Sequence, residues 1–139
     1  MKAETKWLGK MRFVTTPPSG HGIEMDASPK VGGDDGAARP MEVFLAGLAG
    51  CTGMDVVSIL GKMRQEITAY RIEAEAEQAP EHPRKFVRVG LRHIIAGKNL
   101  NEEMVKRAVD LSMERYCSAS ASLKDHVDVE TTFEIVEAA

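Results

Sequence analysis

The sequence predicts an α+β fold in the order βββ–α–ββ–α–β, formed by a single domain over residues 1–139. Three observations support this prediction. The first third has short alternating segments separated by turns, the middle has one long apolar helical pattern, and a second helical pattern lies between an alternating hairpin and a final strand. A chain of 139 residues also suits one compact domain.

The first third predicts a meander of three short strands. Gly9-Lys10 and Pro17 to Gly20 form turns, and Gly22 to Asp26 alternates as a third strand should. From Ser28 to Arg39 the glycines, prolines and paired charges predict a loop. The first two strands are indicated by residues that favour sheets: Thr5, Trp7, Phe13 and Val14.

A long helix is predicted from Pro40 to about Gln65, because proline suits the first helical position and a strongly apolar helical pattern follows. Its charges occur only at the ends and at Asp55. A helix that is apolar nearly all round is normally buried on most of its sides. One chain of this size can hardly cover such a helix, so the sequence predicts a homodimer around a long buried central helix.

The second half predicts a hairpin, a helix and a strand. Alternating residues from Ile67 to Glu75 and from Phe86 to Arg92 form an antiparallel hairpin. Asn101 is a good N-cap for a helix from Glu102 to about Tyr116. The last strand is expected from Val127 to Val136.

Composition argues against several classes of protein. A formal net charge of -3 gives no reason to expect nucleic acid as a partner, and the four histidines are too scattered to suggest a metal site. Two cysteines do not make a secreted disulfide framework. Met1 to Lys10 shows no signal peptide, and the longest uncharged helical stretch, Val43 to Met54, is too short to span a bilayer. We expect a cytoplasmic protein without metal, cofactor or membrane partner.

Cys51, in the long helix, is the first candidate for chemistry. The helical period places it on the same side as Met54 and Asp55, and small residues beside it would let a ligand or another backbone approach the thiol. Alternatively, Cys51 is a small hydrophobic residue packed in a core, as most free cysteines are. The small residues include three glycines: Gly47, Gly50 and Gly53.

Cys117 is the second candidate, and a run of serines and alanines follows it. If Ser118 caps a further helical turn, Cys117 lies at a helix start, and both this position and nearby Arg115 favour a thiolate. Alternatively, the thiol is packed under a helix end. Two cysteines in two separate settings of small residues favour a functional role for the thiols more strongly together than either cysteine does alone.

Two charged residues near the start of the long helix are weaker candidates. Glu42 is most simply a first-turn acid that interacts favourably with the helix dipole. Arg39 is most simply a loop arginine, but it could also supply the cation that a reactive thiolate needs.

The segment from Pro40 to Cys51 resembles the first cysteine helix of the osmotically inducible protein C and organic hydroperoxide resistance (OsmC/Ohr) family. Glu114 to Ser118 resembles its second cysteine segment, and the order of elements agrees, so the resemblance covers nearly the whole chain. The residues after Cys51 look closest to the OsmC-like branch. The resemblance implies an intertwined α+β homodimer with two thiol sites at the subunit interface.

The resemblance also implies a cofactor-free, thiol-dependent peroxidase that reduces small organic hydroperoxides in oxidative or osmotic stress defence. Cys51 would be the peroxidatic thiol, which becomes a sulfenic acid. Cys117 would be the resolving thiol, which condenses with it to a disulfide, and a dithiol reductant would then restore both.

The match to the family's active peroxidases is incomplete. They place a glutamate directly after the proline that opens the helix, where this chain has Met41 followed by Glu42. For the arginine that the family uses from its first hairpin, the counterparts here are Lys10 or Arg12, with Arg39 a further candidate. Met41 therefore leaves open a redox sensor or a protein that binds a small apolar ligand without turnover. A structural protein with inert core cysteines is the third hypothesis.

Overall fold

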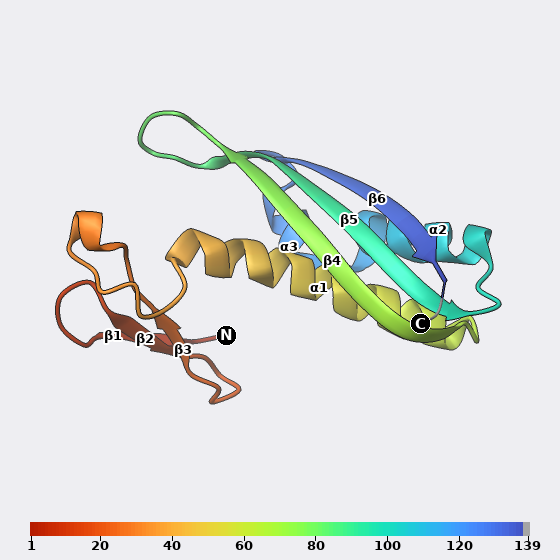
Figure 1. The fold of residues 1–139 in the computed structure, drawn as a ribbon, viewed down its shortest axis with the longest axis horizontal. Helices are drawn as coiled ribbons and strands as arrows, with labels where there is room; N and C mark the ends of the chain where they lie inside the picture. Colours follow the sequence, from red (N-terminus) through yellow and green to blue (C-terminus); the bar gives the residue numbers. More distant parts are fainter. Residues whose placement is uncertain (138–139) are drawn as a thin grey trace. The chain divides into compact units, whose positions relative to one another are not determined.

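The computed structural model describes residues 1–137, and it has the α+β organisation that the sequence predicts (Figure 1). The chain forms two compact units, Met1–Phe44 and Leu45–Ala139. Each unit contains its own three-stranded sheet. The two units are described separately below.

The first unit contains the predicted meander. Strands β1 (Glu4–Trp7), β2 (Phe13–Thr16) and β3 (Ile23–Met25) pair antiparallel in the order β1-β2-β3. The segment predicted as a loop contains one short 3-10 turn, η1 (Pro29–Val31). Lys10, in the turn between β1 and β2, has a left-handed backbone with φ 50°.

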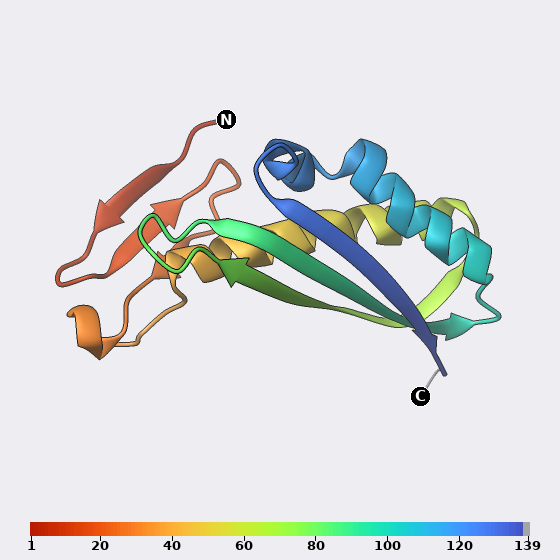
Figure 2. The same ribbon diagram turned by 90° about the horizontal axis from the view of Figure 1, so that it is seen from above.

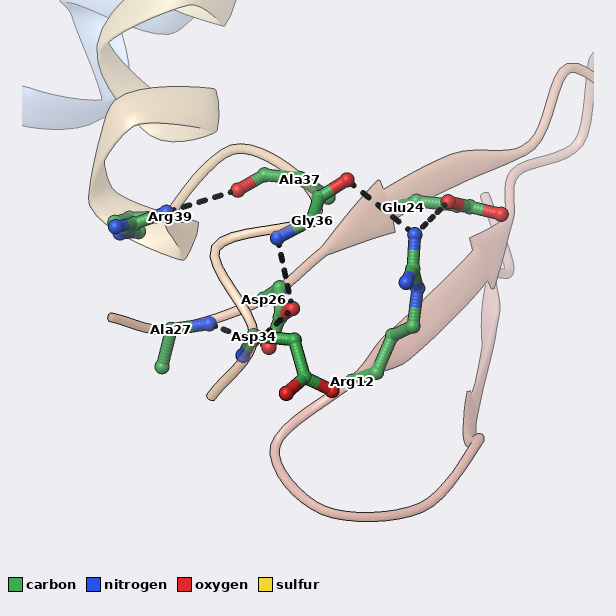
Figure 3. A network of polar contacts seen from close by, with 8 residues as sticks. All are labelled: Arg12, Glu24, Asp26, Ala27, Asp34, Gly36, Ala37 and Arg39. Atoms are coloured by element: carbon green, nitrogen blue, oxygen red, sulfur yellow. Dashed lines mark hydrogen bonds and ion pairs between the residues drawn. The ribbon is translucent and has the colours of Figure 1, made fainter. Parts of the chain in front are cut away.

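A single carboxylate organises the loop that follows β3 (Figure 3). Asp26 is 3% exposed and accepts backbone N–H bonds from Ala27 at 2.7 Å, Gly36 at 3.0 Å and Asp34 at 3.3 Å. These backbone donors hold the pKa of Asp26 below its ordinary value because they stabilise the ionised form. Only glycine fits at position 33, because a Cβ there would lie 2.0 Å from the Ala27 carbonyl oxygen.

The long helix α1 (Pro40–Lys62) starts where the sequence predicts and ends before Gln65. Its first turn is closed by Glu42, whose Oε1 accepts the Arg39 backbone N–H at 2.8 Å. At the other end, Arg64 adopts a left-handed backbone with φ 58°, and the Gln65 N–H bonds to the Leu60 carbonyl at 2.9 Å. This C-terminal closure stops the helix, which a purely apolar pattern does not reveal.

The second unit is built on a mixed sheet in the order β4-β5-β6 (Figure 2). β4 (Glu66–Gln78) and β5 (Phe86–Lys98) form the predicted antiparallel hairpin, and both strands are longer than the alternating segments indicated. β6 (Asp128–Val136) pairs parallel to β5. A parallel neighbour requires a crossover connection, which the helical segments between β5 and β6 provide.

The crossover contains three helical pieces, whereas the sequence predicted a helix from Glu102 to about Tyr116. α2 (Glu102–Leu111) is followed by one π-helical turn, η2 (Ser112–Tyr116), and then by α3 (Ser118–Leu123). The predicted cap is confirmed, because Asn101 Oδ1 accepts the Met104 N–H at 3.1 Å. The predicted end near Tyr116 is confirmed, but the last turn is π-helical, with the Cys117 N–H bonded five residues back to Ser112 O at 2.7 Å.

The core of the second unit lies between its sheet and its helices. Both α1 and α2 pack on one face of the sheet, where they meet the inward residues of β5 (Figure 2). The opposite face carries ion pairs such as Arg88–Glu130 at 2.9 Å and Arg92–Glu73 at 3.1 Å. The inward residues of β5 alternate along the strand: Val89, Leu91, His93 and Ile95.

Within this single chain, α1 is buried along one stripe only. The rest of its surface stays apolar and open, with Met54 77% exposed and Val57 46% exposed. By length and composition alone α1 could also cross a membrane, a criterion that the core helix of a soluble protein meets as well. The buried stripe recurs every four residues: Leu48, Thr52, Val56 and Leu60.

Candidate thiol site

The structure brings together the two cysteines, which are 66 residues apart in the sequence. Both are free thiols, and Cys51 on α1 packs against the hydrophobic cluster that contains Cys117. Their side chains are close enough for the two thiols to interact directly. The cluster is completed by residues of α1 and β5 that include Leu48, Val89 and Leu91.

The two thiols differ in exposure, and the buried one, Cys117, has a perturbed pKa. Cys51 is half-buried, whereas Cys117 is 2% exposed. Burial raises the pKa of the Cys117 thiol, hydrogen bonds from Ser120 oppose this rise, and the neighbouring Cys51 adds to it. Cys117 is therefore held as a protonated thiol that solvent barely reaches, while Cys51 remains accessible.

The segment before α3 corrects the prediction made for Cys117. Cys117 itself, and not Ser118, is the N-cap of α3, and its Sγ accepts the Ser120 N–H at 3.4 Å. The expectation that this position and Arg115 favour a thiolate is wrong, because Arg115 is exposed and burial of the thiol dominates. A helix start lowers the pKa of a thiol and apolar burial raises it, and at Cys117 burial has the larger effect.

An open apolar groove of about 570 Å³ lies between α1 and β4, on a side of the helix next to Cys51. Gly53 makes the close approach that the sequence indicated, since a Cβ there would lie 3.0 Å from Ile72 Cδ1. Gly50 lines the same groove, with nothing within 4 Å of its position. Met54 also lines the groove and is 77% exposed.

Glu42 and Arg39 have partners within the first unit. The Glu42 carboxylate caps the start of α1, as its first-turn position indicates. The Arg39 guanidinium pairs with Asp35 at 2.6 Å and donates to the Ala37 carbonyl at 3.1 Å. Within residues 1–137, neither Glu42 nor Arg39 hydrogen-bonds to a cysteine sulfur, and no other charged side chain does so.

The two basic residues of the first hairpin are also paired. Lys10 forms an ion pair with Asp34. Arg12 reaches Glu24 at 2.9 Å and the Gly36 carbonyl at 3.3 Å (Figure 3). Both side chains thus help to hold the loop that Asp26 organises.

Three hydroxyl and carboxylate groups beside the thiols were not recognised as candidates from the sequence. Ser112 Oγ lies 2.7 Å from Thr52 Oγ1 and donates to Asp55 Oδ2 at 2.9 Å. Thr52 and Ser112 are fully buried. In the sequence, only the spacing of Asp55 from Cys51, one helical turn, pointed to a polar group on this part of the helix.

Tyr70, a half-buried residue that lines the groove, pairs with the buried His93. The Tyr70 hydroxyl is 2.6 Å from His93 Nδ1, and the two rings stack with centroids 5.9 Å apart. Burial raises the pKa of Tyr70 and lowers the pKa of His93 to about 4. Both side chains are therefore neutral near pH 7. Within residues 1–137, no group of three or more His, Cys, Asp or Glu side chains could hold a metal ion.

The sequence profile of a known family, described as OsmC-like protein, matches residues 32–132. The chain belongs to the OsmC-like family. Protein YhfA of Escherichia coli, a relative, is 38% identical over 138 residues, covering 99% of this chain and 100% of YhfA. These matches confirm the family resemblance that the two cysteine segments indicated.

Solved structures show the same OsmC-like fold. A hypothetical protein from Aquifex aeolicus has 26% identity and a TM-score of 0.86, over 99% of this chain and 97% of that one. The organic hydroperoxide resistance protein OhrB of Bacillus subtilis has 21% identity and a TM-score of 0.64, over 96% of this chain and 98% of that one. At that identity OhrB shows a shared fold, which confirms the predicted α+β OsmC-like architecture.

Proposed function

We propose that this OsmC-like protein is a thiol-dependent peroxidase that reduces small organic hydroperoxides. The Cys51 thiolate attacks the terminal oxygen of the hydroperoxide, and the O–O bond breaks. The alkoxide that leaves takes up a proton and becomes the alcohol, and Cys51 becomes a sulfenic acid. The Cys117 thiol then attacks the Cys51 sulfur, a disulfide forms, and the sulfenic oxygen leaves as water with the thiol proton. A dithiol reductant then reduces this disulfide to the two thiols and is itself oxidised to a disulfide.

The observation that supports this proposal most strongly is the contact between two unequal thiols. A small hydroperoxide can reach the half-buried Cys51. Cys117 beside it is 2% exposed, so it can react with the Cys51 sulfur but is shielded from a hydroperoxide in solution. A buried partner in contact has a high effective concentration, which offsets the smaller thiolate fraction that its raised pKa causes. OhrB, which shares the fold, is named as an organic hydroperoxide resistance protein.

We propose that Glu42 and Arg39, which lie at the start of the helix that carries Cys51, increase the reactivity of the Cys51 thiol. Glu42→Gln keeps an oxygen that can accept the Arg39 N–H but removes the charge, whereas Glu42→Ala removes both. If the charge acts on catalysis, both variants lose hydroperoxide turnover. If Glu42 only caps the helix, Glu42→Gln keeps the turnover of the wild type. Arg39→Ala should slow alkylation of Cys51, and an unchanged rate excludes Arg39 from the site.

We also propose that the protein is a cytoplasmic homodimer in which a second copy covers the open side of α1. This surface exposes Met54 and Val57 beside the apolar groove. A membrane is a poorer cover, because Asp55 lies near the middle of the helix and a carboxylate there is costly in a bilayer. Met54→Glu should shift the dimer to monomer in light scattering, while Thr132→Glu, on the charged face of the sheet, should not. A monomeric wild type contradicts this part of the proposal.

A second candidate function is a redox sensor or a binding protein for small apolar ligands. The lack of a cation bonded to either sulfur within residues 1–137, together with Met41 at the family's glutamate position, favours it. Such a protein would form the disulfide, or retain a ligand in the groove, without catalytic turnover.

The test is consumption of cumene hydroperoxide and tert-butyl hydroperoxide by the full chain with a dithiol reductant. We expect turnover in the wild type, none in Cys51→Ser, and a single oxidation without efficient recycling in Cys117→Ser. Thr52→Ser, which changes the next residue but keeps its hydroxyl, serves as the matched control. Wild-type turnover that survives in Cys51→Ser refutes the proposal, and reactive thiols without any turnover favour the second candidate.

A further inference from the structure

Ser112 joins the segments that carry the two thiols, and it does so through both its side chain and its backbone. Its hydroxyl bonds to Thr52 and Asp55 on α1, which follow Cys51 by one and four residues. Its carbonyl accepts the Cys117 N–H at 2.7 Å across the π-helical turn η2. Thr52, Asp55 and Ser112 are called the Ser112 network below.

The directions of the bonds in the Ser112 network follow from the number of protons. Ser112 has one hydroxyl proton and donates it to the Asp55 carboxylate at 2.9 Å. The 2.7 Å bond to Thr52 must then be donated by the Thr52 hydroxyl to the Ser112 oxygen. Thr52 and Ser112 are both 0% exposed, so water does not compete for these bonds.

The position of the network matters because of what lies on either side of it. From Cys51 the path runs over one peptide bond to Thr52, across one hydrogen bond to Ser112, and across a second to Cys117. The π-helical turn carries the chain from α2 to the N-cap of α3, where Cys117 lies. Such turns are rare and are frequently found at functional sites.

We propose that Ser112 is a positioning residue that holds the Cys117 thiol against Cys51 and so favours the disulfide between them. This inference rests on the proposed function for the meaning of the disulfide, but its geometry does not require peroxidase activity. Without the Ser112 hydroxyl, the π-helical turn loses the hydrogen bonds of Ser112 to Thr52 and Asp55 on α1, and Cys117 spends less time within reach of Cys51. The Cys51–Cys117 disulfide then forms less readily.

The test measures the equilibrium of the full chain with glutathione. The dithiol protein reacts with one oxidised glutathione to give the protein disulfide and two reduced glutathione molecules, so the equilibrium constant reports the effective concentration of the two thiols. Ser112→Ala removes the central hydroxyl, and Thr52→Val removes its donor at nearly constant shape. Thr52→Ser keeps the donor. Val109→Ala, a 2% exposed residue of α2 outside the network, is the control for a general loss of stability.

We expect the equilibrium constant to fall about tenfold in Ser112→Ala and in Thr52→Val, as is typical for loss of one buried hydrogen bond. The double variant should fall no further than Ser112→Ala alone, because both changes break one network. Thr52→Ser and Val109→Ala should keep the wild-type constant, although Val109→Ala unfolds more easily. If Ser112→Ala does not fold, Thr52→Val carries the same test.

Two results overturn the inference. One is an equilibrium constant within about twofold of the wild type in Thr52→Val, and in Ser112→Ala where it folds. The other is a wild type that forms no Cys51–Cys117 disulfide. By contrast, the expected pattern in a protein that consumes no hydroperoxide supports the positioning role of Ser112 and refutes the proposed peroxidase.

Discussion

Acidification should destabilise this protein through one buried histidine, His93. The side chain is 0% exposed, and its Nδ1 is bonded to the Tyr70 hydroxyl at 2.6 Å. Its other ring nitrogen, Nε2, has no hydrogen-bond partner within residues 1–137. A charged imidazolium would need a second acceptor and solvation at this place, so burial lowers the pKa of His93 from 6.5 to about 4.

The size of the effect follows from this difference in pKa. Because the folded state binds the proton less readily than the unfolded state, the stability is fully present above about pH 6.5 and falls as the pH drops towards 4. The free energy of unfolding should decrease by about 2 kcal/mol between about pH 7 and about pH 5. By about pH 4 the decrease should reach about 3 kcal/mol.

Urea unfolding of the wild type and of His93→Asn at several pH values measures this effect. Asparagine offers an oxygen near the place of Nδ1 that can accept from Tyr70, and it does not titrate in this range. The difference in pH dependence between the two proteins isolates His93 from every other titrating group. Tyr70→Phe keeps the histidine and should keep the pH dependence. Equal slopes for the wild type and His93→Asn would refute the reasoning.

The remaining predictions concern the thiols and one loop glycine. Iodoacetamide should label Cys51 at least about tenfold faster than Cys117 in the native state, because Cys117 is 2% exposed with a raised pKa; equal rates read by mass spectrometry would contradict this. Gly33→Ala should lower the free energy of unfolding by about 2 kcal/mol or more, since its Cβ would lie 2.0 Å from the Ala27 oxygen. Gly22→Ala, with 3.8 Å of clearance from its nearest neighbour, is the control, and equal thermal stability of the two variants would show that the loop can relax.

Local patterns were sufficient for the elements whose causes are local. The proline that starts α1 and the Asn101 cap of α2 are decided by a few adjacent residues, and the structure has both. The meander and the hairpin follow from alternation interrupted by turns. The last residue of α1 was misplaced, because a left-handed Arg64 carries no strong signal in the sequence.

Tertiary contacts decide what the sequence left out. The parallel pairing of β6 with β5 depends on a crossover whose path no local pattern fixes. The π-helical turn begins at Ser112, whose hydroxyl bonds to Thr52 on α1, a residue 60 positions away in the sequence. His93 was one of four scattered histidines, yet alternation along β5 places it on the same face as Leu91 and Ile95. Extending that strand beyond Arg92 would have predicted a buried histidine.

The different accessibility of the two cysteines has one physical cause. Sequence neighbours suggested a thiolate at Cys117, from Arg115 and a helix start, and Arg39 was a candidate cation for Cys51. Burial reverses the order of access, because α1, β5 and α3 close around Cys117 and leave Cys51 at the edge of the same cluster. A peroxidatic thiol must meet substrate, whereas a resolving thiol must meet only the first thiol. Which cysteine is accessible is a property of the packed cluster, so burial supports the roles that the family resemblance implied, whereas the residues next to Cys117 pointed the other way.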